Sequence, residues 1–170
     1  MSLEYYELLG LPRKLTLTPE ELQVRFYQLS RRWHPDLFVR KPEAEKQLAL
    51  DTSSALNDAY RTLRNPIERA EYFLKLEGFD GGELGSNHVP PELLEEVFEW
   101  NMAKEELRGG DASAQTQLEA MARNFGEMLA GSDRELQTLF ANYDAAPGRE
   151  VLAKIRALLN RRKYIQNLVG

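Results

Sequence analysis

Two histidines and no cysteine limit the chemistry that this 170-residue sequence could perform. Without cysteine the chain lacks disulfides, thiolate metal ligands and a thiol nucleophile, and two histidines are too few for a histidine-built zinc site. His34 and Asp36, separated by Pro35, form a pair that could transfer protons. No nucleophile, metal ligand or third catalytic partner accompanies them in the sequence, so we expect no catalytic residue, no metal and no cofactor.

Two other interpretations of His34-Pro35-Asp36 compete with acid–base chemistry. The proline and aspartate are ordinary turn residues, and on their own they would only mark a helix end. Alternatively, the motif is a rigid polar tip between two helices, and Arg31 and Arg32 in the preceding turn suit it to docking on an acidic surface. An enzyme using His34 or His88 remains the alternative of a different class, although His88, beside prolines, is more typical of a solvated connector.

Charge is distributed unevenly along the chain. Lys and Arg total 22 and Asp and Glu total 27, which gives a net charge of −5. The net charge is −1 over residues 1–80, −8 over 81–135 and +4 over 136–170. The negative total argues against a simple electrostatic nucleic-acid binder, and a basic-tail binder using Arg161-Arg162-Lys163 would need salt-sensitive binding. We also expect a soluble protein, because the chain shows no targeting leader and no apolar run of about 20 residues.

Helical signals position the polar motif in the first half of the chain. Thr18-Pro19-Glu20-Glu21 predicts a capped helix start, and Pro35 predicts where that helix stops. We expect the other helices of this half at Leu3–Leu9, Glu43–Arg64 and Ile67–Leu76. For the helix expected at Glu43–Arg64 we predict one shared core face, formed by Leu48, Ala55, Leu56, Ala59 and Leu63.

The second half also has helical periodicity. Pro91 predicts one helix that ends at Gly109-Gly110, and a second, marked by Ala114 to Met128, is expected to end at Gly131. Ser132 to Glu135 has the pattern of a capping box and predicts a new helix there, before a last helix over about Arg149–Leu168. The fold class we predict is all-α, and short turns favour an antiparallel bundle. Four glycines between Gly78 and Gly85 predict a connector, so we place domains at 1–77 and 90–170 with a linker at 78–89.

The first half resembles the J-domain family of co-chaperones over about residues 1–76. The resemblance depends on Tyr5-Tyr6-Glu7-Leu8-Leu9-Gly10-Leu11, a basic amphipathic helix, His34-Pro35-Asp36 and Leu56-Asn57-Asp58-Ala59-Tyr60-Arg61-Thr62-Leu63, in the family's order. It implies an N-terminal J-domain that binds the ATPase domain of a seventy-kilodalton heat-shock chaperone and stimulates its ATP hydrolysis. The implied contacts are His34, Pro35 and Asp36, with Arg25, Arg31 and Arg32 as helix candidates, whereas Leu37 departs from a position that is often basic.

The whole chain is similar to the HscB and Jac-type co-chaperone family of iron–sulfur assembly. This resemblance depends on Arg69-Ala70-Glu71-Tyr72 in its helical context and on the helical C-terminal half. It implies an HscA- or DnaK-type chaperone as one partner and an IscU-type iron–sulfur scaffold protein as the other, with no membrane or nucleic acid involved and a monomer or weak dimer. Because the chain has no cysteine-rich zinc segment, the resemblance favours a bacterial, cytoplasmic member.

Periodicity independently indicates a partner site on the helix that begins near Pro91. One stripe, formed by Leu93, Val97, Trp100 and Leu107, is the natural core face, and a second apolar stripe of Leu94, Phe98 and Met102 is turned about 100° from it. The second stripe predicts either a helix buried on both sides or an exposed apolar patch that receives a partner. On the last helix, we expect Tyr164 to project away from the core as an interface anchor.

The family resemblance places scaffold contacts on these same positions. They fall on Leu94, Phe98, Glu99 and Tyr164, and also on Met102, where the family usually has an acidic residue. The main alternative keeps the J-domain but gives the C-terminal bundle a different client, or self-association.

Overall fold

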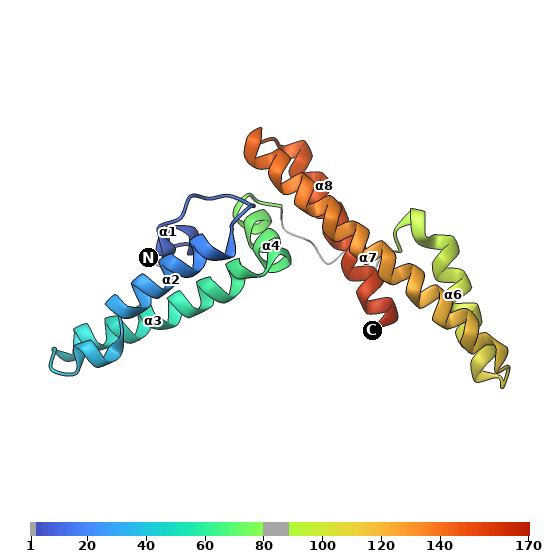
Figure 1. Cartoon of the computed structure of the whole chain (residues 1–170), viewed down its shortest axis with the longest axis horizontal. Coiled ribbons are helices and arrows are strands. Elements are labelled where there is room, and N and C mark those ends of the chain that lie inside the picture. Colours follow the sequence, from blue (N-terminus) through green and yellow to red (C-terminus); the bar gives the residue numbers. More distant parts are fainter. Residues whose placement is uncertain (1–2, 80–88) are drawn as a thin grey trace. The chain divides into compact units, whose positions relative to one another are not determined.

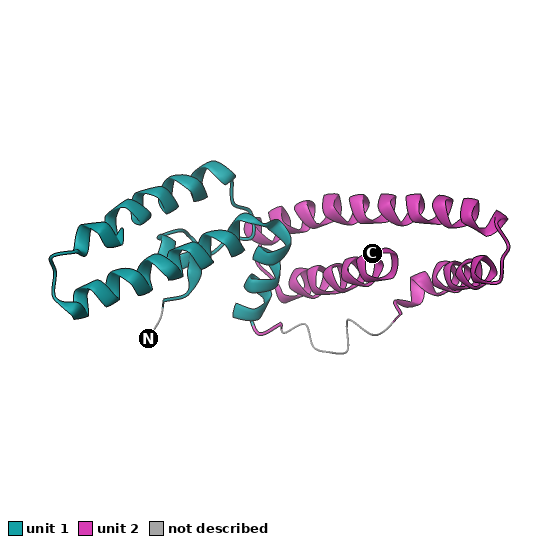
Figure 2. Cartoon of the chain, turned by 90° about the horizontal axis from the view of Figure 1, so that it is seen from below, with its two compact units in different colours: residues 1–77 teal, residues 78–170 magenta. Residues whose placement is uncertain are grey.

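The computed structural model describes residues 3–79 and 89–170, and it shows helices with no strand among those residues. These helices divide into two compact units, unit 1 (residues 1–77) and unit 2 (residues 78–170) (Figure 2). The all-α prediction is confirmed. Within the described ranges, no helix combines the length and apolar character needed to cross a membrane.

Unit 1 is built around an antiparallel helical hairpin. Its elements in chain order are α1 (Tyr5–Leu9), α2 (Pro19–Arg32), the 3-10 helix η1 (Pro35–Phe38), α3 (Glu43–Arg64) and α4 (Pro66–Leu76). Helices α2 and α3 lie side by side, and α1 and α4 lie at the end of the hairpin opposite η1 (Figure 1). We call the segment from Trp33 to Val39 the tip.

The helix ends of unit 1 follow from local chemistry. Thr18 caps α2 in a reciprocal box, in which its side chain accepts from the Glu21 N–H at 3.2 Å and the Glu21 carboxylate accepts from the Thr18 N–H at 3.1 Å. Asn65 ends α3 and caps α4 by accepting from the N–H groups of Ile67 and Glu68. The predicted capping box at Thr18 and the predicted bounds of α3 are confirmed.

One prediction for α3 is wrong. Leu48 is half exposed, and the buried face is formed by Ala49, Leu56, Ala59 and Leu63. Ala49 is seven residues before Leu56, which keeps it on that face after two turns, whereas Leu48 is turned by a further 100°.

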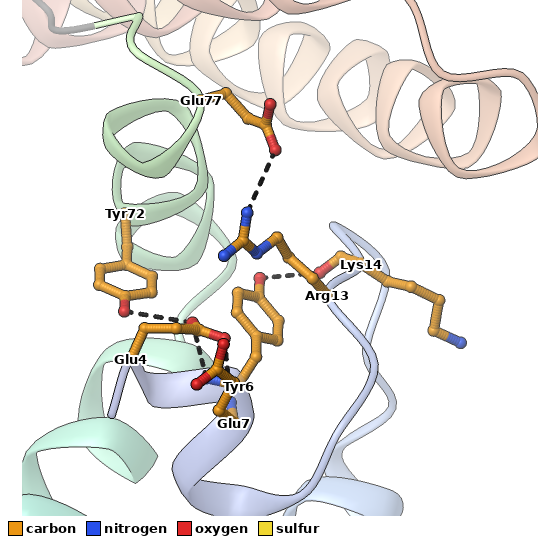
Figure 3. A network of polar contacts seen from close by, with 7 residues as sticks. All are labelled: Glu4, Tyr6, Glu7, Arg13, Lys14, Tyr72 and Glu77. Carbon is orange, nitrogen blue, oxygen red and sulfur yellow. Dashed lines mark hydrogen bonds and ion pairs between the residues drawn. The ribbon is translucent and has the colours of Figure 1, made fainter. Parts of the chain in front are cut away.

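A polar network joins α1 to the loop after it and to α4 (Figure 3). The Glu4 carboxylate caps α1 by accepting from the N–H groups of Tyr6 and Glu7, both at 3.0 Å, and it also accepts from the Tyr72 hydroxyl at 3.4 Å. The buried Tyr6 hydroxyl donates to the Lys14 carbonyl at 2.8 Å. Burial raises the pKa of the Tyr72 phenol, and the nearby Glu4 carboxylate acts in the same direction. The network fixes the base from which the hairpin extends.

Unit 2 is organised around one long helix. Its elements are η2 (Pro91–Leu93), α6 (Leu94–Arg108), α7 (Ser113–Ala145) and α8 (Arg149–Val169). Helix α6 lies along the first half of α7 and α8 along the second half, so two antiparallel pairs share α7 (Figures 1 and 2). The three helices meet at a cluster that contains Trp100, Phe125 and Ile165.

The predicted break at Gly131 and the predicted capping box at Ser132 are wrong. Helix α7 is continuous over 33 residues, and Ser132 is buried inside it. A glycine inside a helix costs about 1 kcal/mol relative to alanine. Burying one large apolar side chain contributes about 1.5–3 kcal/mol, and Phe125, Leu136 and Phe140 are fully buried around this point. Packing against α6 and α8 therefore outweighs the local stop signals.

Candidate functional site

The tip holds His34 and Asp36 in one fixed turn. His34 has φ −62° and ψ 129°, the extended conformation that a following proline imposes. Its Nδ1 accepts a hydrogen bond from the Asp36 N–H at 3.2 Å and lies 3.6 Å from the Asp36 carboxylate. Because Nδ1 is an acceptor, the neutral imidazole carries its proton on Nε2 and can donate it to a partner. Both side chains are exposed, so the structure presents a donor and a carboxylate in a defined geometry.

An aromatic stack anchors the tip to the end of α2. The rings of Trp33 and Phe38 are parallel, with centroids 5.9 Å apart and an interplanar angle of 2°. Trp33 is the C-cap of α2 and Phe38 is the last residue of η1, so the stack closes the turn that contains Pro35. The His-Pro-Asp turn is therefore held at both ends.

An open groove of about 290 Å³ runs from α2 to the tip, lined by Tyr27, Ser30, Arg31 and His34. The sequence interpretation included Arg31 and His34 but missed Tyr27 and Ser30. The available signal was their spacing, because positions 27, 30, 31 and 34 follow the i, i+3, i+4, i+7 pattern of one helical face.

The three candidate arginines have different environments. Arg31 and Arg32 are exposed, and neither forms an ion pair among the described residues. Arg25 is half-buried, and its Nε donates to the Leu9 carbonyl at 2.9 Å, which satisfies the C-terminal end of α1. Gly10 has φ 65° and no Cβ, which leaves room for this guanidinium. Arg25 thus has a structural role, and its chaperone contact stays a prediction.

The outer face of α6 is an exposed apolar stripe, which we call the α6 patch. It contains Leu94, Phe98 and Met102, all about half or more exposed, with exposed Glu99 beside them. The opposite face is buried, with Leu93, Val97, Trp100 and Ala103 in the core cluster. The possibility that α6 is buried on both sides is wrong for unit 2. Three large apolar side chains on one exposed face are typical of a protein-binding surface.

Tyr164 does not project away from the core as predicted. It is half-buried and packs against the cluster that contains Trp100 and Ile165. The following residue, Ile165, is fully buried, and a long tyrosine side chain one position away reaches the same cluster edge. Its predicted scaffold contact stays a prediction.

The described residues contain no group of three or more His, Cys, Asp or Glu side chains arranged to hold a metal ion. His88, the second candidate histidine, lies outside the described residues, as does most of the predicted linker. His34 lies on an open groove on the hairpin surface. The tip thus presents the exposed His34 and Asp36 side chains at the end of that groove.

Comparisons with known proteins agree with both units. Residues 4–72 match the DnaJ domain family, and residues 89–169 match the HSCB C-terminal oligomerisation domain family. A co-chaperone protein HscB homolog of Aromatoleum aromaticum is 31% identical over 153 residues, which cover 89% of this chain and 85% of that protein.

Solved structures show the same likeness. The crystal structure of human co-chaperone protein HscB matches 98% of this chain and 78% of its own length, with 25% identity and a TM-score of 0.69. Chaperone HscB from Vibrio cholerae matches 97% of this chain and 96% of its own, with 27% identity and a TM-score of 0.59. The resemblance seen in the sequence is confirmed, and the chain belongs to the HscB family of co-chaperones.

Proposed function

We propose that the tip of unit 1 binds the ATPase domain of an HscA- or DnaK-type chaperone and stimulates ATP hydrolysis there, and that this chain performs no catalysis itself. The observation that carries the proposal is the hydrogen-bonded His34–Asp36 turn beside Arg31 and Arg32, which form no ion pair with the residues that the structure describes. A rigid turn of this kind loses little conformational freedom on binding. The exposed guanidinium groups of Arg31 and Arg32 suit carboxylates on the partner and speed encounter with an acidic surface.

We propose that the α6 patch binds an IscU-type iron–sulfur scaffold protein, with Glu99 at its edge and Tyr164 supporting it from α8. The patch supports this proposal because Leu94, Phe98 and Met102 offer apolar area that folding leaves unused. The chain has no cysteine to ligate a cluster, so in this proposal it delivers the scaffold and does not hold the cluster.

Carrying both surfaces on one chain raises the effective concentration of the scaffold at the chaperone. We assign the chaperone contact to residues 1–77, a linker to 78–89 and the scaffold contact to 90–170. A cytoplasmic, bacterial setting and a monomer or weak dimer complete the proposal, and the bacterial relative supports the setting.

A steady-state ATPase assay with the chaperone tests the first contact. We expect the wild-type chain to raise turnover and His34→Gln to abolish the increase, because glutamine cannot reproduce the imidazole that caps the Asp36 N–H. Leu94→Ala is the matched control, since it alters an exposed residue of unit 2 and should stimulate fully. Undiminished stimulation by His34→Gln would contradict the proposal.

Titration calorimetry with the scaffold protein tests the second contact. We expect the combined change Leu94→Ala, Phe98→Ala and Tyr164→Ala to weaken binding by at least about 30-fold, because it removes an aromatic and aliphatic anchor group. His34→Gln should bind the scaffold like wild type. Unchanged affinity in the triple variant would move the client site elsewhere, and no binding by wild type would favour a different client.

A further inference from the structure

The tip itself carries two large aliphatic side chains, Leu37 and Val39, that are exposed. Leu37 is 62% exposed and Val39 is 64% exposed, so their apolar surface stays in water. Neither belongs to the buried core of unit 1. Both come within five residues of His34 in the sequence.

The local geometry directs these side chains outward. A 3-10 helix has about three residues per turn, so the neighbours of an inward residue point to the two other sides. Phe38 is the inward residue of η1, because its ring stacks on Trp33. Leu37 and Val39 therefore stand on either side of an anchored ring.

The backbone also ties Leu37 to the polar turn. The Leu37 N–H donates to the His34 carbonyl at 3.0 Å, which places the two residues one 3-10 turn apart. Leu37 is therefore held in the same hydrogen-bonded turn as His34, whose side chain lines the groove with Tyr27, Ser30 and Arg31.

We propose that Leu37 and Val39 form an apolar edge that docks on an apolar patch of the chaperone's ATPase domain, next to the carboxylates that meet the arginines. This inference rests on the proposed chaperone contact and adds the chemistry by which the partner is selected. The occupant follows from continuity, because a surface that contacts both His34 and Asp36 lies against their immediate neighbours. A partner then binds well only if its surface has an apolar patch beside acidic residues, because an acidic surface alone does not match the apolar edge.

Salt separates the two kinds of contact. Exposed charges are screened within about 8–10 Å at physiological salt, so the contribution of Arg31 and Arg32 weakens as salt rises. Burial of aliphatic surface does not depend on charge and persists. Burying most of a Leu and a Val side chain corresponds to about tenfold or more in affinity.

The test measures the Kd for the chaperone's ATPase domain by calorimetry at about 0.05 M and about 0.5 M salt. The test variant is Leu37→Gln combined with Val39→Thr, the conservative variant is Leu37→Met, and the control is Leu3→Gln, which changes an equally exposed leucine (58%) before α1. We expect the double variant to bind about tenfold more weakly at both salt concentrations. Leu37→Met and Leu3→Gln should bind within about twofold of wild type.

ATPase stimulation by His34→Gln, measured in parallel, distinguishes the two possible failures. If His34→Gln abolishes stimulation while the double variant binds within about twofold of wild type, the apolar edge is overturned and the chaperone contact stands. A loss in the double variant that disappears at high salt also overturns it, because the effect would be electrostatic. If His34→Gln stimulates normally, the proposed chaperone contact fails and the edge fails with it.

Discussion

The tip of unit 1 and the α6 patch of unit 2 are both exposed, yet they are built in opposite ways. At the tip, Pro35 and the hydrogen bond from the Asp36 N–H to His34 fix individual polar atoms in space. On α6, a regular helix presents Leu94, Phe98 and Met102, and its rigidity comes from the buried face behind them.

The difference shows what each kind of contact requires. A polar contact depends on donor and acceptor positions to within a few tenths of an ångström. The tip meets this requirement because a proline, a side-chain cap and an aromatic stack together fix one short turn. An apolar contact depends mainly on area, so spacing along a helix suffices. Substitutions of the polar residues His34 and Asp36 should therefore act in an all-or-none manner, whereas substitutions on the patch should act in proportion to the area removed.

Replacing Arg69 tests whether the two regions depend on each other. Arg69 is buried in α4, and its guanidinium donates to the Leu15 and Leu63 carbonyls, both at 2.7 Å. Arg69→Met removes these bonds, and we expect a loss of about 3 kcal/mol in the unfolding free energy of unit 1. Urea denaturation measures the loss, and calorimetry should show unchanged scaffold affinity. A matching loss of scaffold affinity would mean that the patch depends on unit 1. Arg61→Met, on exposed α3 surface, is the control.

Replacing Phe98 separates binding from folding on α6. Phe98 is the most exposed member of the patch, at 66%, so Phe98→Ser should weaken scaffold binding by about 2 kcal/mol and change stability by less than about 0.5 kcal/mol. Val97→Ser, one residue away on the buried face, should lower the stability of unit 2 and leave scaffold binding by the folded protein nearly unchanged. Calorimetry and thermal denaturation measure the two effects. Equal destabilisation by both variants would show that the patch is part of the core.

Replacing Tyr164 sharpens the boundary between patch and core. The half-buried ring packs against the core cluster, so Tyr164→Ala should lower the unfolding free energy of unit 2 by about 1.5 kcal/mol. Tyr164→Phe keeps the ring and should stay within about 0.5 kcal/mol of wild type. Denaturant unfolding measures both. If Tyr164→Ala unfolds like wild type, the ring is not a core residue and its binding role would be direct.

Replacing Glu21 gives the smallest effect and one that depends on pH. The hydrogen bond from the Thr18 N–H lowers the pKa of Glu21 below its ordinary value of 4.5. A lowered pKa stabilises the fold above that ordinary value, and the contribution disappears as pH falls through the lowered one. Glu21→Gln should therefore lose about 0.5 kcal/mol at neutral pH and nothing in strong acid. Denaturation against pH measures this. Glu20→Gln is the control, and a pH-independent difference would contradict the assignment.

The sequence predicted the tip well because its determinants are local. His34, Pro35 and Asp36 are consecutive, and the predicted capping box joins Thr18 to Glu21, only three residues away. The α6 patch was also predictable, because helical periodicity separates Leu94, Phe98 and Met102 from the core stripe. The exposure of the α6 patch was not predictable, since a second apolar stripe could equally have packed against another helix.

The errors arose where distant packing decides the outcome. Gly131 and Ser132 carry strong local stop signals, yet α7 continues through them because it packs along both α6 and α8. Tyr164 is off the core stripe by spacing, but its length lets it reach the cluster edge. Neither the continuity of α7 nor the partial burial of Tyr164 can be predicted without knowing how the neighbouring helices pack.

The most direct test of the account measures chaperone ATPase turnover with the scaffold present below saturation. Wild type should raise turnover most, because one chain brings both partners together. The triple variant Leu94→Ala, Phe98→Ala and Tyr164→Ala should retain only the stimulation that wild type gives without scaffold, and His34→Gln should give none. Stimulation by His34→Gln equal to wild type, or full delivery of the scaffold by the triple variant, would contradict the assignment of two separate binding surfaces.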